Sequence, residues 1–549
     1  MKVLTTAASK PFFRFVVVAK ILWLFWIAAV IIAFSAVVCA TDVVTYHNDN
    51  ARTGQNLKET ILTLSNVNSS HFGRLFSMPV DGKIDAEPLY LSSVSIPGQG
   101  THNVLYVVTE HDSVFAFDAD TGAKLWQVSV LQSGESPSDD RKCGNITPEI
   151  GISGTPVIDR SSGPHGTIYL VAMTEESTGN YHQRIHALDI TTGSEEFGGP
   201  TIVAARYPGT GDNHKGKYVY FDAAQYKERA GLLLLNGVIY TGWASHCDYR
   251  PYTGWIIGYS KSTLKLTSVM NVTPNGSEGS IWMGGAGLAS DGKNIYFLDA
   301  NGTFDTTLDS NGFPIKGDYG NGFIKLSTNG NKVHVADYFN TWDTAQESTQ
   351  QSTKDKDLGS GGALVLPDMK DADNKTWHLA IGAGKDSNIY IVNRDNMGKF
   401  NPNNDGAIYQ EIDGVLPGGI FGMPAYFNGS VYYGPEGGKL LQFQFSQAKL
   451  ATTPVSSSGV TYPYPGSTPS ISANQTQNGI VWAIRHFYSK DILHAYDATN
   501  LQHELYNSNQ AGTRDHFGSA SHFGTPLIVN GKVYVGTHSN VTAFGLLNK

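Results

Sequence analysis

The sequence predicts an all-β protein: an eight-bladed β-propeller of four-stranded blades, closed by an N-terminal strand. Three observations predict it, namely the composition, a set of strand-like runs that recurs in a fixed order, and two incomplete ends that complement each other. The chain has 549 residues with 60 glycines, 23 prolines and only 16% charged residues. This is too rich in turn formers for a helical bundle and, at 40% hydrophobic, too apolar for disorder.

The repeat is clearest in its first copy. Four runs of β-branched or aromatic residues follow one another at 87–91, 104–108, 114–118 and 124–128. An Asp-Ala-Asp-Thr-Gly turn joins the third run to the fourth. Such runs separated by Gly, Asn and Asp are strand and hairpin signals. The copy therefore predicts one four-stranded antiparallel sheet.

The same order returns along the rest of the chain, as internal repeats do. We expect further inner strands to begin near residues 154–156, 231–233, 285–287, 361–363, 422–424, 467–469 and 524–526. Second strands are expected at 168–170, 238–240, 294–296, 379–381, 431–433, 480–482 and 533–535. With the first copy this gives eight units.

The two ends of the repeat are incomplete in complementary ways. The last unit reaches the C-terminus at 543–547 and leaves no room for a fourth strand, while the strand-like segment 74–80 precedes the first unit. An N-terminal strand that completes the last sheet closes the ring and removes an exposed sheet edge. We therefore expect residues 73–549 to form the propeller and 41–72 to lead into it.

The first forty residues form a separate targeting segment. Lysines and an arginine precede an apolar run at 21–38, and the small-residue pattern Val38-x-Ala40 follows. This is typical of a secretory signal peptide cleaved after Ala40, although the run is also near the length of an uncleaved membrane anchor. Both alternatives predict export, to the periplasm or the outside of the cell, with membrane contact only through residues 1–40.

Charge and cysteine content narrow the class of partner. The net charge of −9 and the absence of a Lys/Arg run argue against nucleic-acid binding. Cleavage after Ala40 leaves Cys143 and Cys247 as the mature cysteines. In an oxidising compartment we expect them to form a disulfide, the alternative being two buried thiols.

One turn of the repeat connects the sequence to a known family. The first copy contains the pattern Ala116-x-Asp118-x-x-Thr121-Gly122-x-x-x-Trp126. The pattern recurs with only part of these residues at 187–197 and 495–506. Eight units with such turns resemble the quinoprotein alcohol dehydrogenases, and the resemblance covers nearly all of the mature chain. The chain is also similar to the propellers of outer-membrane assembly lipoproteins, which bind no quinone. The first resemblance implies pyrroloquinoline quinone (PQQ) and Ca²⁺ above the propeller axis.

The resemblance to the dehydrogenases also implies roles for individual residues. Trp282 matches the family's tryptophan stacked on PQQ, and Asn301 matches an asparagine bound to Ca²⁺. Asp357 lies where the family has its general base, which also reaches the metal in some members. Lys385 matches a Lys or Arg that contacts the quinone oxygens. The implied reaction removes a substrate hydroxyl proton at Asp357 while hydride passes to the quinone.

Other positions match less well. Asp248 aligns with the family's acidic Ca²⁺ ligand after a one-residue shift, and Asp85 aligns with a glutamate that touches the quinone. The adjacent pair of cysteines that caps PQQ is missing, with Cys143 alone nearby. Where the family has an arginine that contacts the cofactor, this chain has Glu149 nearby. Where the family has a threonine before the third inner strand, this chain has Arg229.

Each candidate also has a purely structural interpretation. Trp282 is equally consistent with core packing between blades, and Asn301 with a turn. Asp357 ends an alternating run of charges of the kind that usually faces solvent. The histidines His516 and His522 of the last unit are expected at the polar surface.

Two functions therefore remain open from the sequence. The first is a PQQ- and Ca²⁺-dependent dehydrogenase that oxidises an alcohol or sugar hydroxyl and passes electrons to a separate carrier. The second is a non-catalytic propeller without a cofactor that binds a protein or a cell-surface polymer. Glu149, the missing cysteine pair and the long polar insertion at 340–356 favour the second.

Overall fold

The computed structural model describes residues 1, 41–329, 332–344, 355–487 and 490–548. Almost all of the predicted targeting segment, and residues 345–354 of the polar insertion, lie outside the described residues. Everything below concerns one compact unit, Thr41–Lys549. In the described part of the chain, no helix has the length and apolar character needed to span a bilayer.

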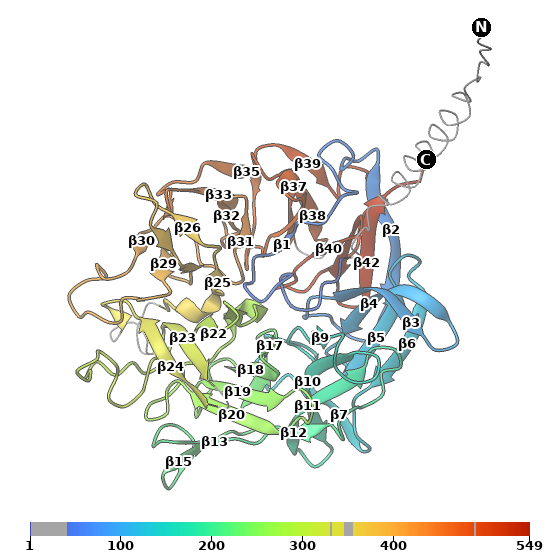
Figure 1. Cartoon of the computed structure of the whole chain (residues 1–549). Helices are drawn as coiled ribbons and strands as arrows, with labels where there is room; N and C mark the ends of the chain where they lie inside the picture. Colours follow the sequence, from blue (N-terminus) through green and yellow to red (C-terminus); the bar gives the residue numbers. More distant parts are fainter. Residues whose placement is uncertain (2–40, 330–331, 345–354, 488–489, 549) are drawn as a thin grey trace. The chain divides into compact units, whose positions relative to one another are not determined.

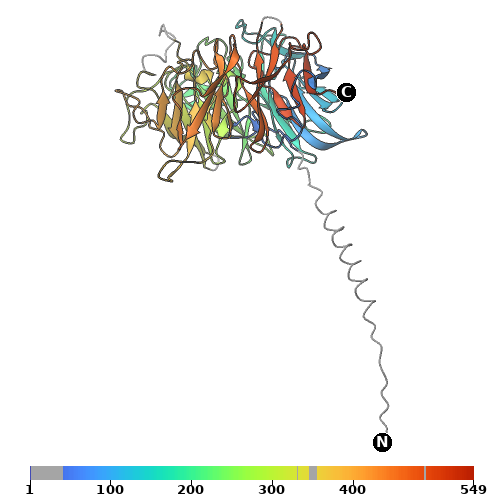
Figure 2. The same cartoon turned by 90° about the horizontal axis from the view of Figure 1, so that it is seen from above.

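The described residues of this unit form an all-β fold. Two short 3-10 helices, η1 (Met283–Gly285) and η2 (Leu358–Ser360), occur in them, and nearly all other regular structure is β-strand. Eight of their sheets contain four or more strands, and these sheets follow one another around a common centre (Figure 1). Figure 2, turned by 90°, shows the strands of the same unit standing beside one another.

The first four of these sheets follow the order that the repeat predicts. The first is β3 (Leu89–Ile96), β4 (Gly100–Val108), β5 (Ser113–Asp118) and β6 (Lys124–Ser129). The second is β9 (Val157–Asp159), β10 (Thr167–Glu176), β11 (Tyr181–Asp189) and β12 (Thr201–Ile202), with β7 (Glu135–Asp139) and β8 (Glu149–Ile150) added beside β10. The third is β17 (Leu233–Leu235), β18 (Val238–Ser245), β19 (Trp255–Ser260) and β20 (Leu266–Asn271), with β16 (Tyr226–Glu228) added beside β18. The fourth is β21 (Ala289–Ser290), β22 (Asn294–Leu298), β23 (Phe323–Asn329) and β24 (Lys332–Phe339).

The remaining four large sheets repeat the pattern. The fifth is β25 (Leu364–Val365), β28 (Leu379–Gly382), β29 (Ile389–Asn393) and β30 (Gln410–Ile412). The sixth is β31 (Ala425–Phe427), β32 (Ser430–Tyr433) and β33 (Lys439–Ser446), with β34 (Lys449–Leu450) and β35 (Ser456–Thr461) both paired to β33. The seventh is β36 (Ser470–Asn474), β37 (Gln477–Arg485), β38 (Ile492–Asp497) and β39 (Glu504–Asn507), with β1 (Gln55–Asn56) beside β36. The eighth is β40 (Leu527–Val529), β41 (Lys532–Gly536), β42 (Asn540–Leu546) and β2 (Phe72–Pro79).

Two small sheets lie outside this pattern. They are β13 (Arg206–Pro208), β15 (Tyr218–Tyr220) and β14 (His214–Lys215), and the hairpin of β26 (Met369–Lys370) and β27 (Thr376–Trp377). The first lies in the connection between the second and third large sheets, and the second lies within the fifth.

The segment expected to pair beside the C-terminus is strand β2. It runs antiparallel to β42, from Phe72 opposite Leu546 to Pro79 opposite Asn540. The Phe72 ring lies 5.4 Å from that of Trp482, which belongs to the seventh sheet, and 6.4 Å from that of Phe544 in the eighth. This strand is therefore held both by the β-ladder and by aromatic packing.

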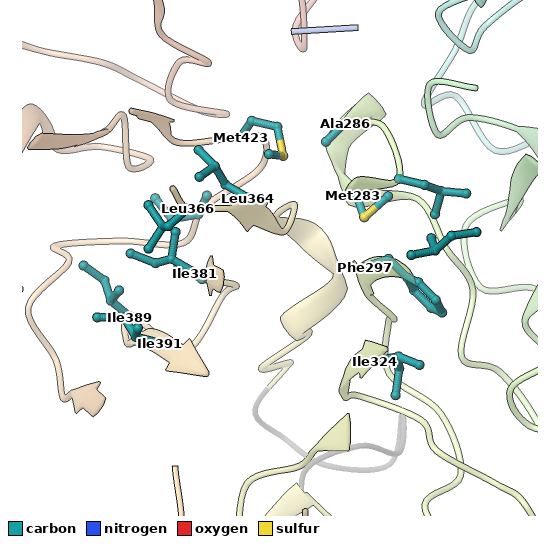
Figure 3. Packing of buried hydrophobic residues seen from close by; sticks show 14 of the residues in the cluster. Met283, Ala286, Phe297, Ile324, Leu364, Leu366, Ile381, Ile389, Ile391 and Met423 are labelled. Atoms are coloured by element: carbon teal, nitrogen blue, oxygen red, sulfur yellow. The ribbon is translucent and has the colours of Figure 1, made fainter. Parts of the chain in front are cut away.

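Neighbouring large sheets pack against each other on both faces. In β22, Ile295 and Phe297 join one hydrophobic cluster, whereas Tyr296 joins another. Because successive side chains of a strand point to opposite faces, one strand supplies both clusters. Burial on both faces explains why the sequence runs are continuously apolar rather than alternating. Figure 3 shows Phe297 and Ile324 of the fourth sheet on one side and Ile381 of the fifth on the other.

The leading segment 41–72 crosses the inner strands of all eight large sheets. Its backbone and side chains form, in chain order, these hydrogen bonds: Val43 N to Tyr90 O (2.8 Å), Ile158 N to Val44 O (2.8 Å), Asn50 Nδ2 to Leu234 O (3.0 Å), Ser290 N to Asn50 O (2.6 Å), Val365 N to Ala51 O (2.9 Å), Tyr426 N to Thr53 O (2.8 Å), Ile471 N to Gly54 O (2.7 Å) and Asn56 Nδ2 to Ile528 O (3.0 Å). One short stretch of chain thus holds every inner strand.

Arg52 is the central side chain of this segment. It is fully buried and donates hydrogen bonds from Nε to Leu288 O (2.8 Å) and from Nη2 to Leu232 O (3.1 Å). Burial lowers its pKa to about 10, so the guanidinium remains charged at neutral pH. A Cβ on Gly287 would lie 2.8 Å from the Arg52 guanidinium carbon, which explains a glycine there.

We predict that Arg52→Met destabilises the protein on the order of 3 kcal/mol, because buried carbonyl oxygens of two sheets lose their donor. The measurement is the free energy of unfolding in urea. Arg206→Met is the control: the guanidinium of Arg206 lies over the Tyr218 ring at the surface, and its loss is expected to change stability by less than about 0.5 kcal/mol. Equal stability of the two variants would contradict this role.

Candidate functional site

A cavity of 370 Å³ lies where segments of most of the large sheets meet. Its walls are formed by Gly144, Asn145, Ile146, Lys227, Arg229, Ala244, Ser245, Cys247, Asp248, Ser280, Trp282, Asp357, Lys385, Phe421, Tyr464, His522 and Phe523. Most of these residues come just before an inner strand or just after a second strand, and these ends coincide in an antiparallel pair. The volume is in the range of small-molecule sites.

Four of the six predicted site residues line this cavity together. Trp282 immediately precedes η1, Asp357 immediately precedes η2, and Lys385 lies in the turn between β28 and β29. Asp248 follows the end of β18. Trp282 is partly exposed to the cavity rather than enclosed between sheets, so its side chain presents an aromatic surface there.

The carboxylate of Asp357 has two unequal oxygens. Oδ2 accepts a hydrogen bond from Trp282 Nε1 (3.0 Å) and lies 3.5 Å from Lys385 Nζ. Oδ1 is buried and has no hydrogen-bond partner among the described residues. The residue is only 4% exposed, and burial raises its pKa to about 6 against the opposing effect of Lys385.

Lys385 is a positioned cation. Its Nζ lies 2.6 Å from Asp355 Oδ2 and sits near the rings of Trp282 (5.7 Å) and Phe421 (5.8 Å). Burial disfavours its charge, but Asp357 and Asp355 outweigh that effect and hold its pKa above the usual value. It is therefore protonated at neutral pH.

The other two predicted residues, Asn301 and Asp85, stand behind the cavity wall. Asn301 donates from Nδ2 to Asp355 Oδ1 (2.8 Å), and its own Oδ1 is buried without a partner among the described residues. Asp85 is buried, pairs with Lys83 Nζ at 3.0 Å and accepts a hydrogen bond from Ser521. Neither side chain belongs to the lining.

The disulfide expected on export is present. Cys143 and Cys247 are bonded, which joins the connection between β7 and β8 to the end of β18. Cys247 lines the cavity, and the next residue, Asp248, accepts hydrogen bonds from Ser245 Oγ (3.0 Å) and Tyr252 OH (2.8 Å). The cross-link thus lies in the cavity wall.

The donor atoms of the predicted metal set fit a hard cation in part. Ca²⁺ prefers oxygen ligands, and the buried Oδ1 atoms of Asp357 and Asn301 are without hydrogen-bond partners in the described part of the chain. Among the described His, Cys, Asp and Glu side chains, a ligand-like group of three occurs elsewhere, at Glu135, Glu176 and His182. Arg184 pairs with Glu135 there at 2.6 Å, so that cluster is an ion-pair network.

Several lining residues were not expected from the sequence. His522 was expected at the polar surface and is exposed, and it also lines the cavity because the segment before β40 reaches it. Phe421, Tyr464 and Phe523 share that position before an inner strand, which is the signal that locates them. Glu149 is not part of the lining and instead contacts His111 Nδ1 at 2.9 Å, so the expected charge reversal does not face the cavity.

Comparisons with known proteins support the same architecture. Quinohemoprotein alcohol dehydrogenase from Comamonas testosteroni superimposes with a TM-score of 0.60 at 14% identity, covering 92% of this chain and 80% of that one. The chain has a quinoprotein-type fold. Quinohemoprotein alcohol dehydrogenase ADHIIG from Pseudomonas putida HK5 gives a TM-score of 0.58 at 13% identity over 93% and 81%. A europium-containing methanol dehydrogenase gives 0.56 at 12% identity over 92% and 98%.

These structural likenesses, all below 15% identity, concern the fold. No protein-family model matches the chain, and no curated protein matches it in sequence. The propeller-type, all-β architecture is therefore established by structure, while residue roles are argued from the cavity itself.

We predict that Asp357→Asn stabilises the protein above pH 6. Its pKa of about 6 exceeds the unfolded value of 3.8, so native stability falls as pH rises from about 4 to 6 and then levels off. The variant escapes that loss and gains about 2–3 kcal/mol at pH 7.5, with no gain below pH 4. Urea unfolding across this pH range measures it.

Asp355→Asn is the matched control, because Lys385 holds the pKa of this carboxyl below its usual value despite partial burial. This substitution should destabilise at neutral pH. A loss of stability in Asp357→Asn at pH 7.5 would contradict the assignment of Asp357 as a buried, disfavoured charge.

Proposed function

We propose that the cavity is the active centre of an exported quinoprotein dehydrogenase that oxidises an alcohol or sugar hydroxyl. The observation that supports this proposal best is the convergence of Trp282, Asp357 and Lys385, which the sequence places in two different units. The structural neighbours named as alcohol and methanol dehydrogenases support the same class of reaction. Export rests on the targeting pattern of residues 1–40.

We also interpret the eight large sheets as eight propeller blades with β2 closing the ring. The pairing of β2 with β42 supports closure, because it gives the last sheet its fourth strand. The hydrogen bonds from the leading segment to each inner strand in turn support the blade count. The cavity then lies over the axis that these strands surround.

The residues present fit a flat, anionic cofactor such as PQQ. Trp282 and Phe421 offer aromatic surfaces with ring centroids 6.1 Å apart, and Lys227, Arg229 and Lys385 offer positive charge. When bound, PQQ would supply the acceptor for the hydride. Asn301 and Asp357 are the residues that would hold Ca²⁺, which polarises oxygen groups.

Asp357 is suited to remove the hydroxyl proton of the substrate. Trp282 and Lys385 both engage Oδ2, which fixes the carboxylate and leaves Oδ1 to accept the proton. A pKa of about 6 keeps Asp357 ionised at neutral pH yet basic enough to take a proton in the transition state. Lys385 stays protonated beside it and stabilises the ionised base before the proton moves.

The alternative function is a propeller that binds a protein or polymer and holds no cofactor. It accounts for Asp85, which pairs with Lys83 instead of facing the cavity. The two functions differ in two respects. Only the dehydrogenase binds a quinone, and only the dehydrogenase needs Asp357 as a base.

We predict dye-linked oxidation of alcohols or sugars after reconstitution of the full chain with PQQ and Ca²⁺. The rate constant kcat/KM should rise with pH through about 6 and then level off, because Asp357 acts as the ionised form. Asp357→Asn should lower kcat about 10²–10⁴-fold.

The control is Asp299→Asn. Asp299 is fully buried next to this site but outside the lining, and burial raises its pKa well above the usual value. Its substitution should leave the rate unchanged. Full activity in Asp357→Asn, or no quinone binding and no activity in the wild type, would reject the dehydrogenase.

A further inference from the structure

Two cations stand side by side in the cavity wall. Lys227 and Arg229 belong to or directly follow β16, two residues apart, so they point to the same face of the chain. Their exposed fractions are 5% and 4%, and both line the cavity. Glu228 between them points away, since a Cβ on Gly154 would meet its Oε2.

Neither cation has an ion-pair partner among the residues that the structure describes. Lys227 Nζ donates to Ser245 O at 3.0 Å, and Arg229 Nη1 donates to Ser153 O at 3.3 Å. Arg229 Nη2 is buried with no hydrogen-bond partner in the same set of residues. Lys and Arg are almost never fully buried unless paired, because a lone charge loses its hydration.

The acids that face this pair are engaged elsewhere. Asp85 pairs with Lys83 at 3.0 Å, and Asp248 accepts hydrogen bonds from Ser245 and Tyr252. Glu110 accepts from Gly151 N (2.8 Å) and Ser153 Oγ (2.9 Å). Burial and the charge of Asp85 raise the Glu110 pKa to about 8, so it carries little charge at neutral pH.

The electrostatics agree with this geometry. Burial, reinforced by Arg229, lowers the pKa of Lys227 to about 8, and the nearby acids Glu110, Asp248 and Asp85 offset this effect only in part. The Arg229 guanidinium also lies 5.4 Å from the centroid of the Phe523 ring, which fixes its orientation. The wall therefore holds two oriented positive charges that make no ion pair within the described part of the chain.

We propose that Lys227 and Arg229 together bind the carboxylates of a flat dicarboxylate or tricarboxylate ligand in this cavity. This inference rests on the proposed function, because it takes the cavity to be the active centre. It adds the charge of the ligand and the residues that bind the ligand's carboxylates. Guanidinium and ammonium groups suit this task because each forms charge-assisted hydrogen bonds to carboxylate oxygens.

The test uses two probes on the full chain without added metal: PQQ, and isophthalate as a flat dicarboxylate that has no redox chemistry. Both should raise the Tm of the wild type, because each binds the native state. Lys227→Met and Arg229→Met should each weaken binding about 10–100-fold by calorimetry, the loss expected for one charge-assisted hydrogen bond. Lys227→Gln and Arg229→Lys replace either variant that fails to fold.

A second readout separates ligand recognition from a structural role. Lys227→Met removes an unpaired buried charge, so the Tm of the ligand-free protein should stay equal or rise. Arg184→Met is the matched control: Arg184 is equally buried but pairs with Glu135 at 2.6 Å outside the cavity. It should lower Tm and leave the affinity for both probes unchanged.

Each outcome decides between the two proposals. Isophthalate binding that depends on Lys227 and Arg229 supports this inference, even if PQQ fails to bind and the quinone proposal falls. PQQ binding that neither substitution weakens keeps the quinone and overturns the inference. Absence of binding by both probes to the wild type also overturns it, and dye-linked activity then judges the proposed function separately.

Discussion

The contact between the leading segment and the inner strands is the constraint on which the structure depends. An inner strand at the centre of a ring has an edge of unpaired N–H and C=O groups, which is costly away from water. Residues 43–56 satisfy part of that edge in each of the eight large sheets. The Arg52 side chain donates further hydrogen bonds to the carbonyl oxygens of Leu232 and Leu288. Because the leading segment fixes the positions of the inner strands relative to one another, the segments that precede these strands meet in one cavity.

The cavity departs from the rules that the rest of the unit obeys. Between neighbouring sheets, apolar side chains of the described residues fill both faces. In the cavity, Asp357 is buried with a raised pKa, and Lys227 and Arg229 lack counter-ions among the described residues. Such groups cost stability in the ligand-free protein, and proteins keep them where function needs them. The large sheets around the cavity, packed on both faces, offset this cost.

Local sequence pattern accounts for most of the fold and for the centre of the site. Strand signals located the inner strands within a few residues, as with the segment at 361–363 and the observed start of β25 at Leu364. The incomplete last unit predicted the pairing partner of β2. Trp282, Asp357, Lys385 and Asp248 were found because a family resemblance places them before or after such strands.

What the sequence could not reveal depends on distant contacts. Arg52 reaches carbonyls that lie 180 and 236 residues further along the chain, and no local pattern encodes that reach. Asp85 aligns with the family's glutamate in sequence, but its side chain pairs with Lys83 and Ser521 and does not line the cavity. Arg229 was noted from the sequence only for the family position it occupies, and Lys227 was not singled out, whereas the structure shows both buried without an ion-pair partner among the described residues. His522 is exposed as expected, but a turn-rich segment does not indicate that this exposed side chain also lines the cavity.

Hydrogen exchange with and without PQQ and Ca²⁺ tests the central claim most directly, because it reports where on the chain a ligand acts. The account predicts slower exchange in separate peptides that contain residues 227–229, 282, 357, 385 and 523, which only this cavity brings together. Exchange in residues 43–56, which lie outside the cavity lining and mostly accept hydrogen bonds from the inner strands, should not change. Protection confined to other surfaces, or no protection at all, would contradict the account.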